Sequence, residues 1–338
     1  MTYGNKFPFH SCKKSELENL FSDSVSPTIN DDETSQHLAF VSDDEDHDHG
    51  IFLKPNCNNY NVHDFLNLKN SKNLNIYHNN LNGLENKIDI LREFLVNVNP
   101  KFDIIAISET SEKIKTNFIS NVNLSGYELF STPSNSSKGG VALYINSNFN
   151  IIERVDLNSS STHFESVWAE IKNVNSKNIL CASIYRHPHN NNISLSSFFE
   201  YMEHTLSKIS AENKDLYLCG DFNFNLLKTQ NCHFSRHFYE LLNSYGLIAQ
   251  ITTPSRTTES CSTIIDNMFT NNISNKKISG NILTDFSDHF SQFLSVEKIL
   301  IDKKITKLFK RDFSNFSVES FRDDVSIQHF HNDFTDVN

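Results

Sequence analysis

Short apolar runs alternate with segments of helical periodicity from Leu74 onward, and this alternation is the feature that most constrains the fold. The runs expected to form strands are 73–77, 102–107, 141–145, 164–171, 179–185, 216–219, 264–269, 278–283 and 292–296. Amphipathic helices are expected at 84–98, 195–209 and 234–245. Ser194 is expected to cap the second of these helices, and Gly246 to end the third. Such alternation predicts an α/β domain, because helices must cover the apolar faces of a sheet.

The two ends of the chain differ in composition from this middle part. Residues 1–70 hold 12 acidic and 5 basic residues, with too few apolar side chains to offset the entropy of ordering. We therefore expect 1–70 to be mostly disordered, 71–298 to form the folded domain, and 299–338 to be a tail. One main domain agrees with a length of 338 residues.

The composition also bears on the cellular compartment. The 6 cysteines are scattered without Cys-x-x-Cys spacing, which is typical of a reducing compartment. Neither an apolar signal core nor an apolar run of roughly 20 residues is present, so we expect a soluble, intracellular protein with no membrane partner. The net charge of −11 disfavours nucleic acid, but it is concentrated in 1–70, and divalent cations can offset carboxylates at a site.

The stretch Cys219-Gly220-Asp221-Phe222-Asn223 carries the strongest local signal for function. Its apolar residues bring Asp221 and Asn223 to the end of an expected strand, where alternate side chains of an extended segment share a face. Asp221 could then handle a proton while Asn223 orients the same group. Because Asp and Asn after a strand most often make a turn, this stretch alone does not establish a site.

Other polar residues follow, lie within or directly precede expected strands. They are Asn80, Asn82, Glu109, Tyr185, Asp266, Ser287, Asp288 and His289. Each alone has an ordinary explanation, such as an Asn in a turn or a satisfied buried His. Together they predict one rim of a sheet at which side chains from distant segments meet.

The chemistry that such a rim supports is metal-assisted attack on a phosphate ester. Carboxylates such as Glu109 and Asp288 suit Mg²⁺ or Mn²⁺, which neutralises phosphate charge. His and Cys residues lack zinc-ligand spacing, and we expect no organic cofactor.

Proton transfer and phosphate binding need further groups at this rim. His289 can serve if a carboxylate fixes its tautomer, and Asp266 is the candidate for that carboxylate. Tyr185 and Asn80 can donate to phosphate oxygens. Asp221 can take the proton of the attacking water or protonate the leaving group, and the sequence does not decide between Asp221 and His289 as the base.

Six segments, in this order, resemble the motifs of the endonuclease/exonuclease/phosphatase superfamily. They are Asn80-Leu81-Asn82-Gly83-Leu84, Ser108-Glu109-Thr110, Tyr185-Arg186-His187-Pro188, Gly220-Asp221-Phe222-Asn223, Ile265-Asp266 and Ser287-Asp288-His289. Within that superfamily they are most similar to the apurinic-endonuclease-like domain of LINE-type (non-LTR) retrotransposons. Two more segments resemble parts of those elements, Lys138-Gly139-Gly140-Val141-Ala142 and Glu165-Ser166-Val167-Trp168.

The resemblance implies a fold and a metal site. The fold is a four-layer α/β sandwich of the DNase I-like type, with two packed β-sheets flanked by helices. The metal is Mg²⁺ or Mn²⁺, with Glu109 as its principal ligand, Asn80 as a phosphate or metal contact, and Asp288 nearby.

The resemblance also implies roles for the remaining motif residues. Asp221 and Asn223 act at the nucleophile or leaving group, and His289 pairs with Asp266. The side chains assigned to substrate binding are Tyr185, Asn82, Arg186 and Ser287.

The activity that the resemblance implies is nicking of one strand of target DNA, whose 3′ hydroxyl then primes reverse transcription, and this implies access to the nucleus. Residues 311–316 resemble the connector before a reverse transcriptase, so we expect a truncated copy of such an element. A DNA nickase usually has a basic surface. The candidates for it are Lys87, Lys113, Lys115, Lys138, Arg186, Lys228, Arg236 and Arg256.

Two alternative functions stay open from the sequence. The same fold could act on another phosphoester, such as an inositol phosphate, a sphingolipid headgroup or a poly(A) tail, because fold alone does not define substrate. The chain could also be an inactive copy that acts only as a binding module. The sequence does not indicate a partner for residues 1–70.

Overall fold

The computed structural model describes residues 55–68, 73–99, 101–112, 118–136, 138–174, 176–188, 191–258, 260–297, 299, 301, 303 and 317–327. The chain divides into two compact units, Met1–Lys303 and Lys304–Asn338. Most of the acidic segment expected to be disordered, 1–54, and most of the expected tail lie outside the described residues. In the second unit the structure describes one helix, α7 (Val318–Ile327).

The first sheet of the Met1–Lys303 unit has 7 strands in the order β1-β15-β16-β2-β3-β5-β4. They are β1 (Cys57–Asn61), β2 (Asn73–Asn80), β3 (Ile104–Ser108), β4 (Tyr127–Thr132), β5 (Val141–Asn146), β15 (Lys277–Leu283) and β16 (Ser291–Glu297). β2 is parallel to β3 and antiparallel to β16, so the sheet is mixed. The parallel pairing brings the carboxyl ends of β2 and β3 to the same edge.

The second sheet also has 7 strands, with the order β11-β14-β10-β9-β8-β6 and β7 paired to β8. They are β6 (Ile151–Glu153), β7 (Ser159–Ser160), β8 (Phe164–Ile171), β9 (Ile179–Arg186), β10 (Asp215–Asp221), β11 (Ile248–Ala249) and β14 (Asp266–Thr270). β9 and β10 are parallel, so their carboxyl ends also share an edge. A separate hairpin consists of β12 (Arg256–Thr257) and β13 (Ser262–Thr263).

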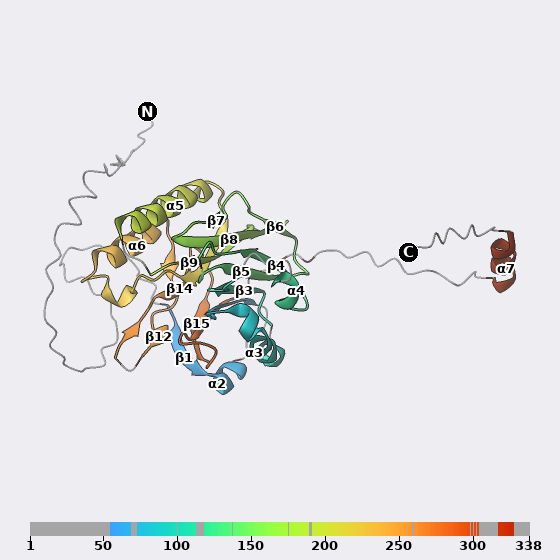
Figure 1. The fold of residues 1–338 in the computed structure, drawn as a ribbon, viewed down its shortest axis with the longest axis horizontal. Helices are drawn as coiled ribbons and strands as arrows, with labels where there is room; N and C mark the ends of the chain where they lie inside the picture. The colour runs from blue at the N-terminus through green and yellow to red at the C-terminus, as the bar shows by residue number, and fades with distance from the viewer. Residues whose placement is uncertain are drawn as a thin grey trace, which may run out of the picture. The chain divides into compact units, whose positions relative to one another are not determined.

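Helices cover the outer faces of the two sheets. Those beside the first sheet are α2 (Val62–Leu66), α3 (Leu84–Asn97) and α4 (Phe118–Asn121), and those beside the second are α5 (Asn192–Ser210), η1 (Leu226–Lys228) and α6 (His233–Ser244). Figure 1 shows α5 and α6 on one side of the packed sheets and α2, α3 and α4 on the other. The chain therefore has the predicted α/β fold, two sheets packed between helices.

The alternation of side chains along the strands produces this layering. On β2, Ile76 belongs to the apolar core between the two sheets, whereas its neighbour Tyr77 belongs to the core beneath α3. Successive residues of a strand point to opposite faces, so each central strand must be apolar on both. Near-continuous apolar runs such as 104–107 result from this burial on both faces.

The structure corrects three expectations about local structure. Residues 57–66 are folded as β1 and α2, where Phe65 is buried beneath the first sheet and β1 adds to its edge through backbone bonds that need few apolar side chains. The N-cap of α5 is Asn191, whose Oδ1 accepts from the Ser194 amide at 2.8 Å, so the Ser194 cap was wrong. The strand expected at 264–269 begins at Asp266, because the Ile264 amide bonds to a side chain instead of the ladder.

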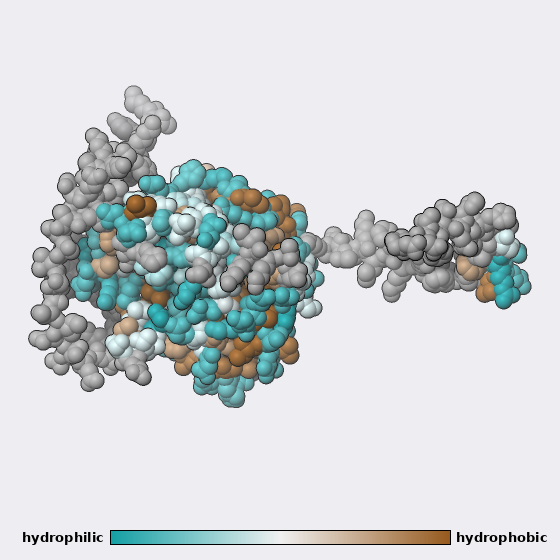
Figure 2. All heavy atoms as spheres, in the orientation of Figure 1, coloured by the Kyte–Doolittle hydropathy of each residue, from teal (hydrophilic) through white to brown (hydrophobic). Residues whose placement is uncertain are grey.

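The surface of the Met1–Lys303 unit mixes polar and apolar side chains. Figure 2 shows apolar atoms in several places on this face, one of them in the region of α3. Helix α3 carries the exposed side chains of Ile90 and Val96. Among the described helices, none combines the length and the apolar composition needed to cross a membrane.

Candidate active site

The register of the second sheet places three of the predicted site residues in one row. On β10, Asp221 lies opposite Tyr185 of β9 and opposite Asp266 of β14. Side chains in one row of a sheet point to the same face, and Tyr185 belongs to the core between the sheets. All three residues therefore face the first sheet at its edge.

The first sheet contributes Asn80, the last residue of β2, and Glu109, which follows β3. The Asn80 amide Nδ2 donates to Glu109 Oε1 at 2.8 Å and to Asp221 Oδ2 at 2.9 Å. Its oxygen Oδ1 accepts from the Asn82 backbone amide at 3.0 Å. One fully buried amide thus connects the edges of the two sheets. Glu109 has φ +52°, a left-handed conformation that is costly for a non-glycine residue and that is found preferentially at functional sites.

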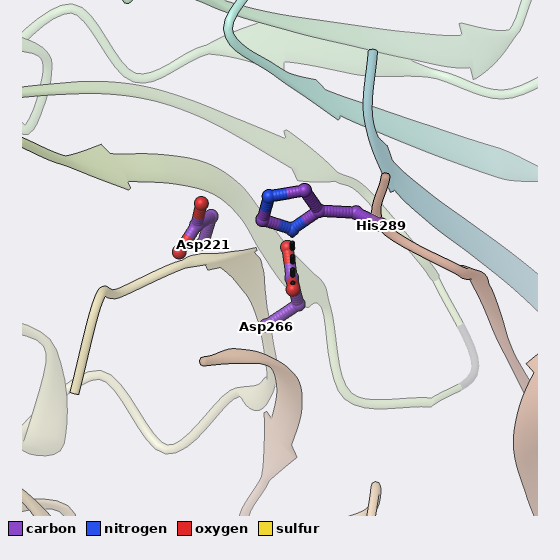
Figure 3. A group of neighbouring side chains, drawn as sticks. All are labelled: Asp221, Asp266 and His289. Atoms are coloured by element: carbon purple, nitrogen blue, oxygen red, sulfur yellow. Dashed lines mark hydrogen bonds and ion pairs between the residues drawn. The ribbon is translucent and has the colours of Figure 1, made fainter. Parts of the chain in front are cut away.

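His289 completes the group from the loop before β16. Its Nδ1 lies 2.8 Å from Asp266 Oδ2, so the predicted pair of His289 and Asp266 is formed. Figure 3 shows the imidazole between two carboxylates, with Nδ1 on Asp266 and the other ring nitrogen on the side of Asp221. Ligand atoms of the three side chains all lie within 4.8 Å of one another.

Burial and mutual charge shift the pKa values of this group. Burial, and then the charge of Asp266, raise the pKa of Asp221 to about 8. Burial lowers the pKa of His289, but the charge and hydrogen bond of Asp266 outweigh it and the pKa is about 9. Asp221 can therefore gain and lose a proton near neutral pH, while His289 holds its proton there.

Tyr185 remains protonated over the same range. Burial, and then the charges of Glu109 and Asp221, raise the pKa of its hydroxyl well above 10. A neutral phenol beside two carboxylates can donate a hydrogen bond to an anionic group at this edge.

Two predicted roles are changed by the turn after β10. Asn223 has φ +51°, so the segment is no longer extended there, and the expectation that its side chain points with that of Asp221 was wrong. Its backbone amide instead donates to Asp221 Oδ1 at 3.0 Å, and its side chain donates to the Arg186 carbonyl at 2.6 Å.

Arg186 is fully buried, which contradicts the predicted contact with substrate and with a basic surface. Its guanidinium donates to the carbonyls of Phe222 at 2.7 Å and Asn223 at 2.8 Å. The Cζ atom lies 4.0 Å from the centroid of the Phe224 ring. Arg186 therefore holds the turn that carries Asp221, and the desolvation that this burial entails lowers its pKa to about 10.

The remaining motif residues lie at the rim of the site. Ser287 Oγ donates to the Asn80 carbonyl at 2.5 Å and accepts from the His289 amide at 3.2 Å, which anchors the loop before β16. Asp288 accepts from Arg256 Nε at 2.9 Å, with its side chain 49% exposed. Asn82 is exposed, with φ +46°. The metal role predicted for Asp288 competes with this ion pair.

One contributor to the site was missed from the sequence. Ser255, fully buried, donates to Asp266 Oδ2 at 2.8 Å and accepts from the Asp266 amide at 3.1 Å. It follows Pro254 in a loop without periodicity, so no pattern distinguished it from other serines. Its contacts hold the carboxylate that orients His289.

The donor set fits a divalent cation held by oxygen atoms. Ligand atoms of Asp221, Asp266 and His289 lie close enough together to hold a metal ion, but a proton on His289, whose pKa is about 9, competes with a metal there. Asp266 Oδ1 is buried without a hydrogen-bond partner among the described residues. Glu109 adds a half-buried carboxylate next to Asp221. Asn80 turns its nitrogen, not its oxygen, toward these carboxylates, which does not support a metal contact by Asn80.

The predicted basic surface is found only in part. Lys138 and Lys228 are exposed, whereas Arg236 donates to the Thr229 carbonyl at 3.0 Å and Arg256 pairs with Asp288. Lys87 is half-buried, and burial lowers its pKa despite the nearby charges of Asp288 and Glu109. Lys113 and Lys115 lie outside the described residues.

Comparison with known proteins agrees with this geometry. The model of the Endonuclease/Exonuclease/phosphatase family matches residues 73–289. Searching the curated proteins returns no match. Among solved structures, the AP endonuclease LMAP from Leishmania major has a TM-score of 0.55 at 13% identity, covering 68% of this chain and 89% of that chain. The human Nocturnin catalytic domain has a TM-score of 0.52 at 15% identity, covering 68% and 95%.

The endonuclease domain of TRAS1, a telomere-specific non-LTR retrotransposon, has a TM-score of 0.48 at 14% identity, covering 67% of this chain and 98% of that chain. The similarities to LMAP and Nocturnin show the fold and do not define a substrate. The family match covers well over half of the chain, so the chain belongs to the endonuclease/exonuclease/phosphatase family.

Proposed function

We propose that this chain is a divalent-metal-dependent phosphodiesterase that nicks one strand of DNA, in the manner of LINE-type endonuclease domains. The observation that supports the proposal is the meeting of Glu109, Asp221 and His289 where the edges of the two sheets adjoin. Asn80 bonds both carboxylates at 2.8 and 2.9 Å, and atoms of His289 and Asp221 lie within 4.8 Å. Attack on an anionic phosphodiester needs such convergence of a proton acceptor, a positive charge and phosphate donors.

Asp221 takes the proton from the attacking water in this proposal. A pKa raised to about 8 by burial suits a group that must gain and lose a proton near neutrality. The Asn223 amide and the Asn80 side chain hold its two oxygens at 3.0 and 2.9 Å. As the water oxygen bonds to phosphorus, its proton moves to the Asp221 carboxylate and the bond between phosphorus and the 3′ oxygen breaks. The 3′ oxyanion takes a proton from solvent to become the hydroxyl, and Asp221 returns its proton to solvent.

His289 and Tyr185 bind the phosphate oxygens. His289 keeps its proton because its pKa is about 9. Its positively charged imidazolium therefore donates a hydrogen bond to the phosphate oxygens on which negative charge develops. Tyr185 keeps its hydroxyl proton and donates as a neutral group. Asp266, held by Ser255 at 2.8 Å, orients the imidazole.

Glu109 would hold the cation, with Mg²⁺ or Mn²⁺ as the ion suited to a carboxylate, water and phosphate oxygens. When bound, that cation neutralises phosphate charge and stabilises the leaving oxyanion. The Asn80 hydrogen bond at 2.8 Å orients the Glu109 carboxylate for this role.

DNA is proposed as the substrate because the rim of the site is open. The side chains of Asp288 and Arg256 are 49% and 38% exposed, and Asn82 and Lys138 are exposed as well, so a polymer can lie across this edge. The Asn80–Leu84 and Tyr185–Pro188 segments, which resemble LINE-type elements, further support DNA over a small phosphoester.

Cleavage of supercoiled plasmid by the purified full chain tests the proposal. We expect Mg²⁺ or Mn²⁺ to convert it to the nicked circle with 3′ hydroxyl ends, and Asp221→Asn or chelation of the metal to abolish this. An intact plasmid, together with turnover of an inositol phosphate, sphingomyelin or poly(A) RNA, would instead establish another phosphoester as the substrate. Metal-independent DNA binding without cleavage would support the inactive binding module.

A further inference from the structure

A second buried polar group lies beside the site and takes no part in the proposed chemistry. Its centre is Glu165 of β8, which is fully buried and lies opposite Tyr185 in the ladder with β9. Glu165 therefore extends the row of Tyr185, Asp221 and Asp266 by one strand and faces the same side of the sheet.

Glu165 binds two partners through one oxygen. Its Oε1 accepts from Ser134 Oγ at 2.6 Å and lies 3.1 Å from His187 Nε2. Its second oxygen, Oε2, is buried and has no hydrogen-bond partner among the described residues. Since a buried carboxylate with an unpaired oxygen is costly, a purely structural role would be served better by a neutral side chain.

The group touches the backbone that carries Glu109. Gly139 has φ +107°, and a Cβ there would lie 2.8 Å from His187 Cε1, 2.8 Å from Ser134 Oγ and 2.9 Å from Glu165 Oε2. The Gly139 carbonyl accepts from the Ser111 amide at 2.8 Å. The backbone of this glycine thus lies directly between the buried group and the left-handed turn at Glu109.

The same group also contacts Tyr185. The edge of the His187 ring packs against Tyr185, with centroids 4.9 Å apart and an interplanar angle of 72°. Tyr185 in turn lies beside Glu109 and Asp221, whose charges act on its hydroxyl. The buried group therefore contacts the ring of Tyr185 and, through Gly139, the turn that carries Glu109.

We propose that Ser134, Glu165 and His187 form a positioning network that sets the distance between Tyr185 and Glu109. Glu165 fixes the orientation of the His187 ring, and His187 fixes the position of the Tyr185 ring. The network also packs against Gly139, whose carbonyl binds the turn that carries Glu109. None of the three touches the reacting atoms, and the proposal rests on the proposed phosphodiesterase function for its effect on catalysis. It assigns a role to the Lys138–Ala142 and Glu165–Trp168 segments.

The test compares Glu165→Gln with Glu170→Gln in the full chain. Glu170 lies on the same strand and is 2% exposed, but it pairs with Lys172 and Lys214 at 2.7 and 2.6 Å, away from the row. We expect Glu165→Gln to lower kcat of plasmid nicking by about 100-fold with KM unchanged, because a displacement of about 1 Å has that effect. Glu170→Gln should lower thermal stability without this loss of kcat.

A readout that does not need catalysis separates this proposal from the nuclease proposal. With 3-fluorotyrosine in the chain, the ¹⁹F resonance of Tyr185 is identified by its loss in Tyr185→Phe. It should shift in Glu165→Gln and not in Glu170→Gln. If the wild type cleaves no phosphodiester, the nuclease proposal fails. The ¹⁹F resonance of Tyr185 still tests the positioning role, because it does not depend on catalysis. If Glu165→Gln does not fold, His187→Asn replaces it in both measurements.

Two results would overturn the network. One is an unmoved Tyr185 resonance in a folded Glu165→Gln protein. The other is a kcat for Glu165→Gln that falls no further than that of Glu170→Gln, or that falls only in proportion to the folded fraction.

Discussion

Gly220→Ala should damage the site through backbone displacement alone, since it removes no functional group. A Cβ at Gly220 would lie 2.0 Å from the Ile184 carbonyl oxygen and 2.9 Å from the Ile184 carbonyl carbon. Both atoms belong to the backbone of β9, which pairs with β10 through this register. Real Cβ atoms stay at 3.0 Å or beyond, so the two strands must separate by about 1 Å at this point.

The consequence can be worked from the contacts on either side. Asp221 follows Gly220 directly, and its 2.9 Å bond from Asn80 would lengthen past hydrogen-bonding distance after a shift of about 1 Å. A misplacement of that size is expected to lower kcat by roughly 100-fold. Overpacking should also cost about 1–3 kcal/mol of folding free energy.

The matched control is Gly280→Ala in β15. A Cβ there would lie 2.1 Å from the Asn58 carbonyl oxygen of β1, a similar clash at the far edge of the first sheet. Nicking kinetics and chemical denaturation of both variants provide the comparison. We expect similar losses of stability but a loss of kcat only in Gly220→Ala. Equal kcat values for the two folded variants would refute the reasoning.

Three further predictions concern protonation and the turn after β10. Asp266→Asn should lower the pKa of His289 from about 9, because the Asp266 charge and hydrogen bond raise it, and a histidine NMR titration that still finds about 9 would contradict this. Burial lowers the pKa of His78 from 6.5 to about 4. Between these two pH values the unfolded state binds a proton that the folded state does not, so about 3 kcal/mol of folding stability should be lost as the pH falls from 6.5 to 4. Denaturation at pH 7.5 and 4.5 should show a smaller pH effect in His78→Gln than in wild type or in the exposed control His204→Gln. Arg186→Lys should cost about 2 kcal/mol, measured by denaturation, because a lysine lacks the planar fork whose Nε and Nη2 donate to the two carbonyls; a loss under about 0.5 kcal/mol would contradict it.

A single side chain, that of Asn80, connects the two sheets at the site. Each sheet ends its parallel strands at the same edge, and the buried amide of Asn80 bonds a carboxylate from each. Because that amide donates twice and accepts once, it has little freedom to turn. A substitution at Asn80 would therefore leave the buried Asp221 and the half-buried Glu109 carboxylates without their shared donor.

Much of the fold could be predicted because its signals are local. The helix expected at 84–98 is α3, and the strand expected at 164–171 is β8, since both follow from the spacing of apolar residues alone. Residues 57–61 and 127–132 escaped this reasoning, because they form edge strands whose side chains are half exposed and carry little periodicity.

The sequence by itself determined which polar residues stand at strand ends, because hydrophobic periodicity marks where each strand stops. Only the tertiary structure decided what each of them faces. The row of Tyr185, Asp221 and Asp266 depends on the register of strands far apart in the chain. The apolar pattern of one strand indicates which face a side chain takes, but not which residue of a distant strand lies opposite it. The burial of Arg186 and the turn of Asn223 likewise depend on φ angles and neighbours that only the packed sheets supply.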